Sequence, residues 1–176
     1  SDLTVTKTAQ TSFTRTYTWA IDKSVDKTKL ILEGANPQSA TFNYTVEVTH
    51  DNGTDSAWEV KGEIKVSNPN DWQDITANVS DLVNNGGGAS CTVEGEAVKT
   101  VSVPAGGSVT LDYVCTFASK PNYIGLNTAT ATWDDALYHT PNGSTTGSAA
   151  ANFTSPTTIV DGSVTVVDDK TDPLNP

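Results

Sequence analysis

Apolar and polar residues alternate with a period of two along much of the chain. In the run 109–117 (VTLDYVCTF), Leu111, Tyr113 and Cys115 fall on one side, and polar residues such as Asp112 fall on the other. The same alternation recurs in three further runs, 42–48, 58–66 and 129–133. Because successive strand side chains point to opposite faces, each run predicts a strand with one apolar and one solvated face.

Turn-forming residues separate these runs, and helix signals are scarce. The expected turns are 51–53, 68–70, 85–88, 104–107 and 141–143. The one helix-like candidate is 71–83, and its apolar spacing is poor. Short strands at this spacing predict an all-β fold, an antiparallel Ig-like β-sandwich.

The ends of the chain differ in character from the middle. We expect an extended lead-in over 1–12, a sandwich over 13–169 and a tail over 170–176, whose prolines cannot continue a strand ladder. The lead-in is either a linker or a donor strand. As a donor strand it would add to the open sheet edge of a neighbouring copy, with Leu3 and Val5 filling that neighbour's groove.

The charge of the chain restricts its partners. Its 176 residues carry a formal net charge of -11, which repels nucleic acid and anionic lipid. No apolar run approaches the roughly 20 residues of a membrane span. We therefore expect no nucleic-acid partner and no membrane insertion of this segment.

The two cysteines, Cys91 and Cys115, predict a disulfide and an oxidising compartment, so an extracellular or cell-surface location. The alternative is two free thiols in the core. A hairpin at 104–107 would place Cys115 opposite about Glu96. Cys91 then reaches Cys115 only if the chain folds back near 94–95.

Six stretches together resemble a known kind of module. They are YTWAIDKSVDKT, FNYTVEV, WEVKGEIKVSNPN, VPAGGSVTLDYVC, LNTATATW and DGSVTVVDD. The pattern over 15–169 is similar to the Ig-like, prealbumin-like stalk domains of bacterial secreted and cell-surface proteins, related to Cna protein B-type repeats. The resemblance implies a non-enzymatic structural module: a stalk, an adhesin or a pilus-like filament subunit. Its partners would be neighbouring copies or domains of the same surface protein.

Many domains of this kind carry an intramolecular isopeptide bond between a lysine and an asparagine, and the resemblance implies a search for one. Lys23 shares the side of Trp19 and Ile21, and Asn127 shares the side of Ala129 and Ala131. Buried lysine is a neutral nucleophile that can attack a carboxamide. The alternative is that Lys23 lies at a strand end and extends to water.

The reaction also needs a carboxylic acid near the amide, and no acid fits cleanly. The side chains of Glu47 and Asp112 are expected to point to the solvated faces of their strands. The side chain of Asp135 is expected to point inward, but Asp135 lies near a strand end.

Ligand sites are weaker expectations. No cofactor is expected, except that the acidic tail residues Asp168, Asp169 and Asp172 could bind calcium, which takes about 6–8 oxygen ligands. Trp72 lies in a polar loop and could stack on a sugar, which gives an alternative function as a carbohydrate- or ligand-binding module. The two histidines, His50 and His139, occur in turn-like segments without a hydrolase motif, so no enzyme is expected.

Overall fold

The computed structural model describes residues 1–31, 33–35 and 38–168. The chain divides into two compact units, each made of two segments. The first unit comprises Ser1–Arg15 and Asp55–Thr158, and the second comprises Thr16–Thr54 and Ile159–Pro176.

The described residues are mostly strand. The strands that build the first unit are β1 (Thr4–Lys7), β2 (Gln10–Thr16), β5 (Thr54–Ser67), β6 (Ile75–Val83), β7 (Ala89–Val93), β8 (Val98–Val103), β9 (Ser108–Phe117), β10 (Leu126–Thr132) and β11 (Ser144–Ala150). One short helix, α1 (Asp135–Tyr138), follows β10. The second unit contains β3 (Trp19–Val25) and β4 (Tyr44–His50), and β12 (Thr158–Val160) begins at the boundary between the units.

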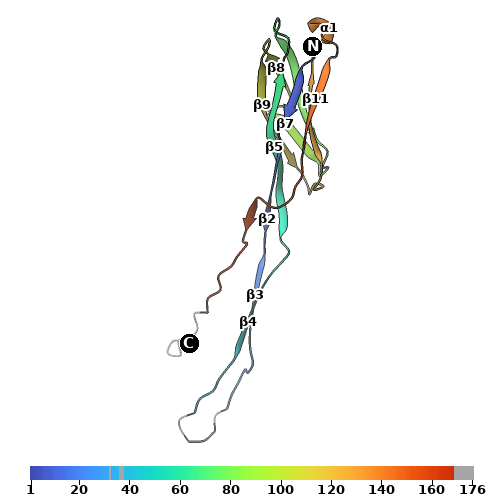
Figure 1. Ribbon diagram of the computed structural model, residues 1–176. Helices are drawn as coiled ribbons and strands as arrows, with labels where there is room; N and C mark the ends of the chain where they lie inside the picture. Colours follow the sequence, from blue (N-terminus) through green and yellow to red (C-terminus); the bar gives the residue numbers. More distant parts are fainter. Residues whose placement is uncertain (32, 36–37, 169–176) are drawn as a thin grey trace. The chain divides into compact units, whose positions relative to one another are not determined.

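The first unit is an antiparallel β-sandwich (Figure 1), which confirms the all-β expectation. One sheet has the order β2-β5-β9-β7, and β1 also pairs with β5. The other sheet has the order β11-β10-β6-β8. Alternate residues of both sheets face inward, which follows from the period-two patterns of the sequence.

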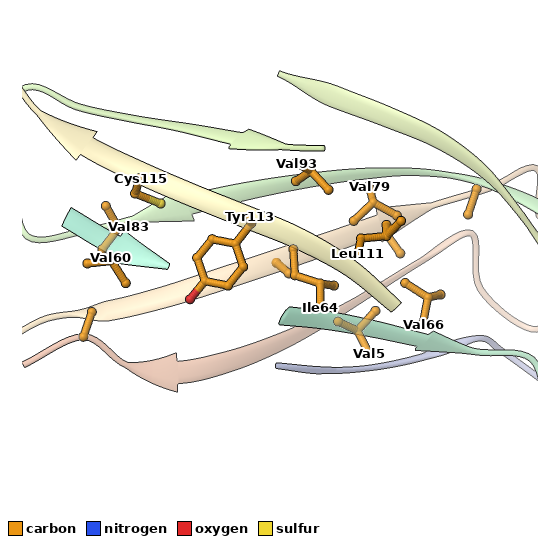
Figure 2. Close-up of a cluster of buried hydrophobic side chains, with 14 of the residues drawn as sticks. Val5, Val60, Ile64, Val66, Val79, Val83, Val93, Leu111, Tyr113 and Cys115 are labelled. Carbon is orange, nitrogen blue, oxygen red and sulfur yellow. The ribbon is translucent and has the colours of Figure 1, made fainter. Parts of the chain in front are cut away.

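The core lies between these two sheets (Figure 2). Ile64 of β5, Val79 of β6 and Val93 of β7 are fully buried. Leu111 and Tyr113 of β9 are almost fully buried as well. Each fully buried aliphatic side chain of this kind contributes roughly 1.5–3 kcal/mol, so burial of this core stabilises the unit.

The structure corrects two local expectations. The expected hairpin at 104–107 is wrong, because Val103 pairs with Ile75 in one sheet while Ser108 pairs with Ser67 in the other. The turn at 104–107 therefore connects a strand of one sheet to a strand of the other. The helix-like candidate 71–83 contains strand β6 instead, whose burial alternates from Ile75 onward.

The N-terminal residues belong to the sandwich itself. β1 pairs with β5 in the register Val5↔Val66, and Leu3 and Val5 are 1% and 8% exposed. Residues 3–7 are therefore not an extended lead-in outside the sandwich: Leu3 and Val5, expected to fill a neighbour's groove, fill the core of their own unit. Gly147 allows this packing, since a Cβ there would lie 2.4 Å from the Val5 carbonyl oxygen.

The second unit is a two-stranded ladder with little burial. β3 pairs with β4 in the register Lys23↔Val46, and no described residue of this unit is fully buried. Ile21 and Tyr44 are 63% and 60% exposed. The row that contains Lys23 therefore faces no closed core within the described part of this unit.

Candidate functional site

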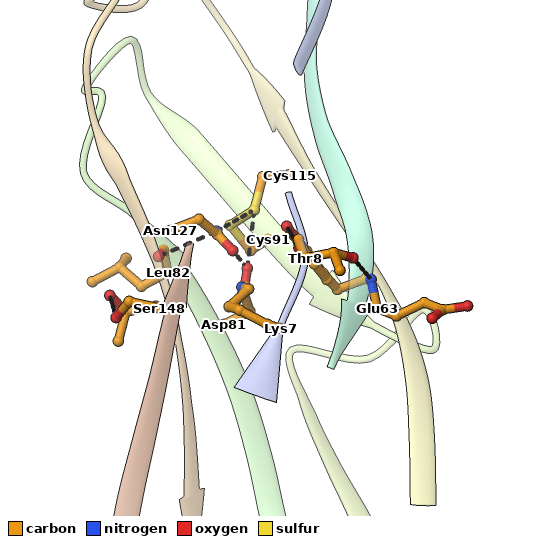
Figure 3. A network of polar contacts seen from close by, with 11 residues as sticks. Lys7, Thr8, Glu63, Asp81, Leu82, Cys91, Cys115, Asn127 and Ser148 are labelled. Atoms are coloured by element: carbon orange, nitrogen blue, oxygen red, sulfur yellow. Dashed lines mark hydrogen bonds and ion pairs between the residues drawn. A yellow bond between two sulfur atoms is a disulfide. The ribbon is translucent and has the colours of Figure 1, made fainter. Parts of the chain in front are cut away.

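Three polar side chains meet inside the sandwich of the first unit (Figure 3). The Lys7 ammonium donates to Oδ1 of Asp81, and both side chains are completely buried. The Asn127 amide nitrogen donates to Oδ2 of the same carboxylate at 2.7 Å, and Asn127 is fully buried. One carboxylate therefore holds a lysine and an asparagine that are 120 positions apart in the chain.

Lys7 is the last residue of β1, and this strand positions its side chain. Leu3, Val5 and Lys7 share one side of an extended chain, so the ammonium enters the core beside two apolar residues. The end of β1 is fixed to β5, because Thr8 donates its amide to the Glu63 carbonyl at 3.0 Å and its hydroxyl accepts from the Glu63 amide at 3.1 Å.

Two neighbours in the same sheet complete the setting of Lys7. Gly62 leaves room for this part of the chain, since a Cβ there would lie 2.5 Å from the Thr8 carbonyl oxygen. The Tyr113 ring lies opposite Gly62 in the ladder, with its centroid 3.8 Å from the Lys7 Nζ, and its hydroxyl donates to the Thr8 carbonyl at 2.7 Å. A cation over an aromatic face is stabilised by the ring quadrupole.

Asp81 and Asn127 come from adjacent strands of the other sheet. The Asp81 side chain points to the inward face of β6, as do those of the buried residues Val79 and Val83 on either side of it. Asn127 of β10 lies opposite Val83, and Ala129 lies opposite Asp81. Asp81 and Asn127 are therefore diagonal neighbours on one sheet face, and Lys7 reaches them from the opposing sheet.

Burial controls the electrostatics of the site. Desolvation lowers the pKa of Lys7 from its usual value, and the hydrogen bond and negative charge of Asp81 partly oppose this shift. Burial also raises the pKa of Tyr113, with a further contribution from the Asp81 charge. Tyr113 therefore stays neutral, and the lysine is displaced toward its neutral, nucleophilic form.

The Asn127 carbonyl oxygen is an unpaired group in this site. Among the described residues, Oδ1 of Asn127 is buried without a hydrogen-bond partner. A buried acceptor of this kind costs about 1–3 kcal/mol if left unpaired. Rotation of the amide would turn Oδ1 toward Asp81, and a protonated Asp81 would then supply the missing donor.

The three groups have complementary chemistry. Lys7 can act as a nucleophile, the Asn127 carboxamide is an acyl group, and Asp81 can exchange protons with both. All three are shielded from water, which otherwise competes as a nucleophile. The geometry is that of an amide exchange that would join β1 to β10, and so one sheet to the other.

A disulfide borders the site. Cys91 of β7 and Cys115 of β9 are bonded and lie directly opposite in the ladder, so the expectation that Cys115 lies opposite about Glu96 is wrong. The chain does fold back at 94–95, as expected. Asp81 lies close enough to both sulfurs to form a potential metal cluster with them. The sulfurs are joined to one another, so they offer no thiolate ligands.

The two residues expected to form an isopeptide bond lie in different units. Asn127 is buried in the first unit, as its parity predicts. Lys23 lies in the second unit, its side chain is 41% exposed, and it pairs with Asp168 at 2.9 Å. The burial that the chemistry requires is found at Lys7 instead.

Lys7 and Asp81 were not among the residues expected at a site, although both carry a signal in the sequence. Lys7 follows Leu3 and Val5 at period two, and Asp81 interrupts the apolar row of Ile75, Ala77, Val79 and Val83. A charged residue within an otherwise apolar row marks a buried polar group.

The remaining candidate sites are placed as follows. Trp72 is 66% exposed, so it does not fold back onto the domain. Asp168 pairs with Lys23, while Asp169 and Asp172 lie outside the described residues. The described chain holds no helix with the length and apolar character that a membrane crossing requires.

Comparisons of the chain with protein-family models, with curated proteins and with solved structures find no match.

Proposed function

We propose that this chain is a load-bearing structural module of an extracellular surface protein, stapled by an isopeptide bond between Lys7 and Asn127. The observation that carries the proposal is the buried contact of both residues with the Asp81 carboxylate. The resemblance to Ig-like stalk domains supports the same role in a stalk, adhesin or filament.

The reaction follows from the three groups. Desolvation lowers the pKa of Lys7, and transfer of its proton to Asp81 gives the neutral amine that can attack. The Lys7 nitrogen attacks Cγ of Asn127 while Asp81 donates its proton to Oδ1. As the intermediate collapses, a proton passes from Nζ by way of Asp81 to the departing nitrogen, and Oδ1 returns its proton to Asp81. An Nζ–Cγ bond replaces the Cγ–Nδ2 bond, and ammonia, about 17 Da, leaves.

The position of the bond suits a mechanical role. β1 begins at Thr4, and β10 lies in the opposing sheet. Force applied to the N-terminal end would otherwise peel β1 from β5, since the β1–β5 ladder and the contacts around it are all noncovalent. A covalent bond from Lys7 to Asn127 transfers that force directly to the second sheet.

The second unit supports contact with neighbouring copies or domains. An isolated two-stranded ladder is marginally stable in water, and β3–β4 leaves apolar residues exposed. Trp19, Ile21 and Val48 line an apolar groove together with residues 164–167. Exposed apolar surface of this kind is typical of protein–protein contacts.

Intact mass spectrometry of the denatured, reduced chain tests the staple. The wild-type protein should be about 17 Da lighter than its sequence mass. Lys7→Arg should restore the full mass, because a guanidinium stays protonated and is not a nucleophile. Lys23→Arg is the matched control, and it should keep the 17 Da loss. Loss of the staple in Lys23→Arg but not in Lys7→Arg would assign the bond to the other lysine.

A carbohydrate-binding module is the second candidate function, and one observation favours it. Trp72 is 66% exposed in the loop before β6, where its ring could stack on a sugar. Binding on a glycan array that is lost in Trp72→Ala, with an unchanged melting temperature, would support this function. Absence of binding by the wild-type protein would reject it.

A further inference from the structure

A disulfide sulfur forms one wall of the site that holds Lys7, Asp81 and Asn127. Sγ of Cys115 lies 3.3 Å from Oδ2 of Asp81 and 3.4 Å from Nδ2 of Asn127 (Figure 3). Cys115 is fully buried, and its bond to Cys91 links β9 to β7. The sulfur therefore touches both the acid and the amide of the proposed reaction.

The oxidation state of this sulfur changes what it offers to Asp81. A disulfide sulfur has no proton and is only a weak acceptor, whereas a thiol at the same place would donate its S–H to Oδ2. A donor on a carboxylate stabilises the ionised form. The reaction needs Asp81 in its protonated form, and it needs Oδ2 for the amide of Asn127. A thiol would oppose both requirements.

We propose that the Cys91–Cys115 disulfide is a positioning element for the Lys7–Asn127 reaction, so that the isopeptide bond forms faster once the cysteines are oxidised. This inference rests on the proposed function. Oxidation passes two electrons and two protons from the thiols to a disulfide-type oxidant, and the amide exchange that follows is redox-neutral. A chain that remains reduced therefore forms the isopeptide bond more slowly than a chain in an oxidising compartment.

The test follows the rate of the 17 Da loss in the full chain. The chain is made by cell-free synthesis in reduced or oxidised glutathione. Samples taken at intervals are quenched in acid and alkylated, and their intact masses are measured by mass spectrometry. Two variants separate the effects of the bridge and of the thiol. Cys91→Ala leaves the Cys115 thiol beside Asp81, and the double variant Cys91→Ala/Cys115→Ala has neither bridge nor thiol.

We expect the wild-type chain to react about fivefold faster in oxidised than in reduced glutathione, the effect of one net hydrogen bond. Cys91→Ala should be slow in both buffers, and the double variant should react faster than Cys91→Ala. A merely structural role of the bridge would slow both variants equally. Circular dichroism checks that each variant is folded.

Three outcomes overturn the inference. Equal rates for the wild-type chain in both buffers would show that the disulfide has no part in the reaction, and the proposed function would survive. Equal slowing of the single and double variants would reject the role of the sulfur beside Asp81. If the oxidised wild-type chain never loses 17 Da, the proposed function and this inference fail together.

Discussion

Lys7 and Asn127 are held by the two oxygens of one buried carboxylate, although they belong to opposing sheets. Lys7 donates to Oδ1 of Asp81, and Asn127 donates to Oδ2 at 2.7 Å. A polar cluster inside an apolar core is costly unless each group is paired. Covalent joining of Lys7 to Asn127 would remove the buried positive charge altogether.

Asp81→Asn should abolish bond formation. The amide has the shape of the carboxylate but cannot accept a proton from Lys7 and return it to the leaving group. Intact mass should therefore equal the sequence mass of the variant, with no loss of 17 Da. Asp112→Asn, in strand β9 of the opposing sheet and exposed, is the control and should retain the loss. A full 17 Da loss in Asp81→Asn would remove Asp81 from the mechanism.

Two variants that cannot form the bond should differ in stability. Lys7→Met leaves Asp81 buried without its cationic partner, whereas Lys7→Met/Asp81→Leu removes both charges. Breaking a buried ion pair costs more than replacing it by apolar residues, so the double variant should be more stable by about 2 kcal/mol. Urea unfolding at pH 7 measures the difference. Greater stability of the single variant would mean that the Asp81 charge is not buried as described.

These residues show how much the sequence could predict. The alternation of apolar residues predicts the strands and the sandwich, and it correctly turns Asn127 inward. The same rule applied to Leu3-Thr-Val5-Thr-Lys7 would have turned Lys7 inward, and applied to 75–83 it would have found Asp81. The obstacle was that 1–12 is polar overall and that 71–83 could be taken as a helix.

The partners of each strand could not be predicted from local pattern. β1 pairs with β5 across about 60 positions, and such pairing depends on tertiary packing that a period of two does not specify. The turn at 104–107 has the residues of a hairpin, yet it crosses between the sheets. The same limit made Lys23 a candidate, because its row alternates correctly but has no core to face within the described part of its unit.

Pulling experiments should detect the covalent loop. In the stapled chain, residues 8–126 lie between the joined positions and cannot extend when force is applied to the two ends. Under reducing conditions, Lys7→Arg should therefore unfold to a contour length roughly 40 nm greater than that of the wild-type chain. Single-molecule force spectroscopy measures this length. Equal contour lengths for the two proteins would contradict a staple at Lys7.

The ion pair of Arg15 and Asp55 should make stability depend on acid. The Arg15 guanidinium binds both Asp55 oxygens, at 2.7 and 2.9 Å, and it lowers the pKa of Asp55 below its usual value. The folded state therefore keeps this carboxylate ionised at a pH where the unfolded state, with a pKa of about 3.9, takes up a proton. Its contribution is present above that pH and is lost as the pH falls through the lowered pKa.

Asp55→Asn should accordingly destabilise the chain by about 1–2 kcal/mol at pH 7. The difference from wild type should shrink as the pH falls below about 4. Urea unfolding of both proteins over this range gives the comparison. A difference that stays constant with pH would show that the charge of Asp55 is not what stabilises the fold.

Peptide mapping tests the central claim most directly. Trypsin cleaves after lysine and arginine, so the reduced wild-type protein should give residues 1–15, uncut at Lys7, joined to residues 100–170, which contain Asn127. This branched peptide should weigh about 17 Da less than its two parts, and fragmentation should locate the link at Lys7 and Asn127. A free peptide of residues 1–7, cut at Lys7, together with an unmodified Asn127 would contradict the account.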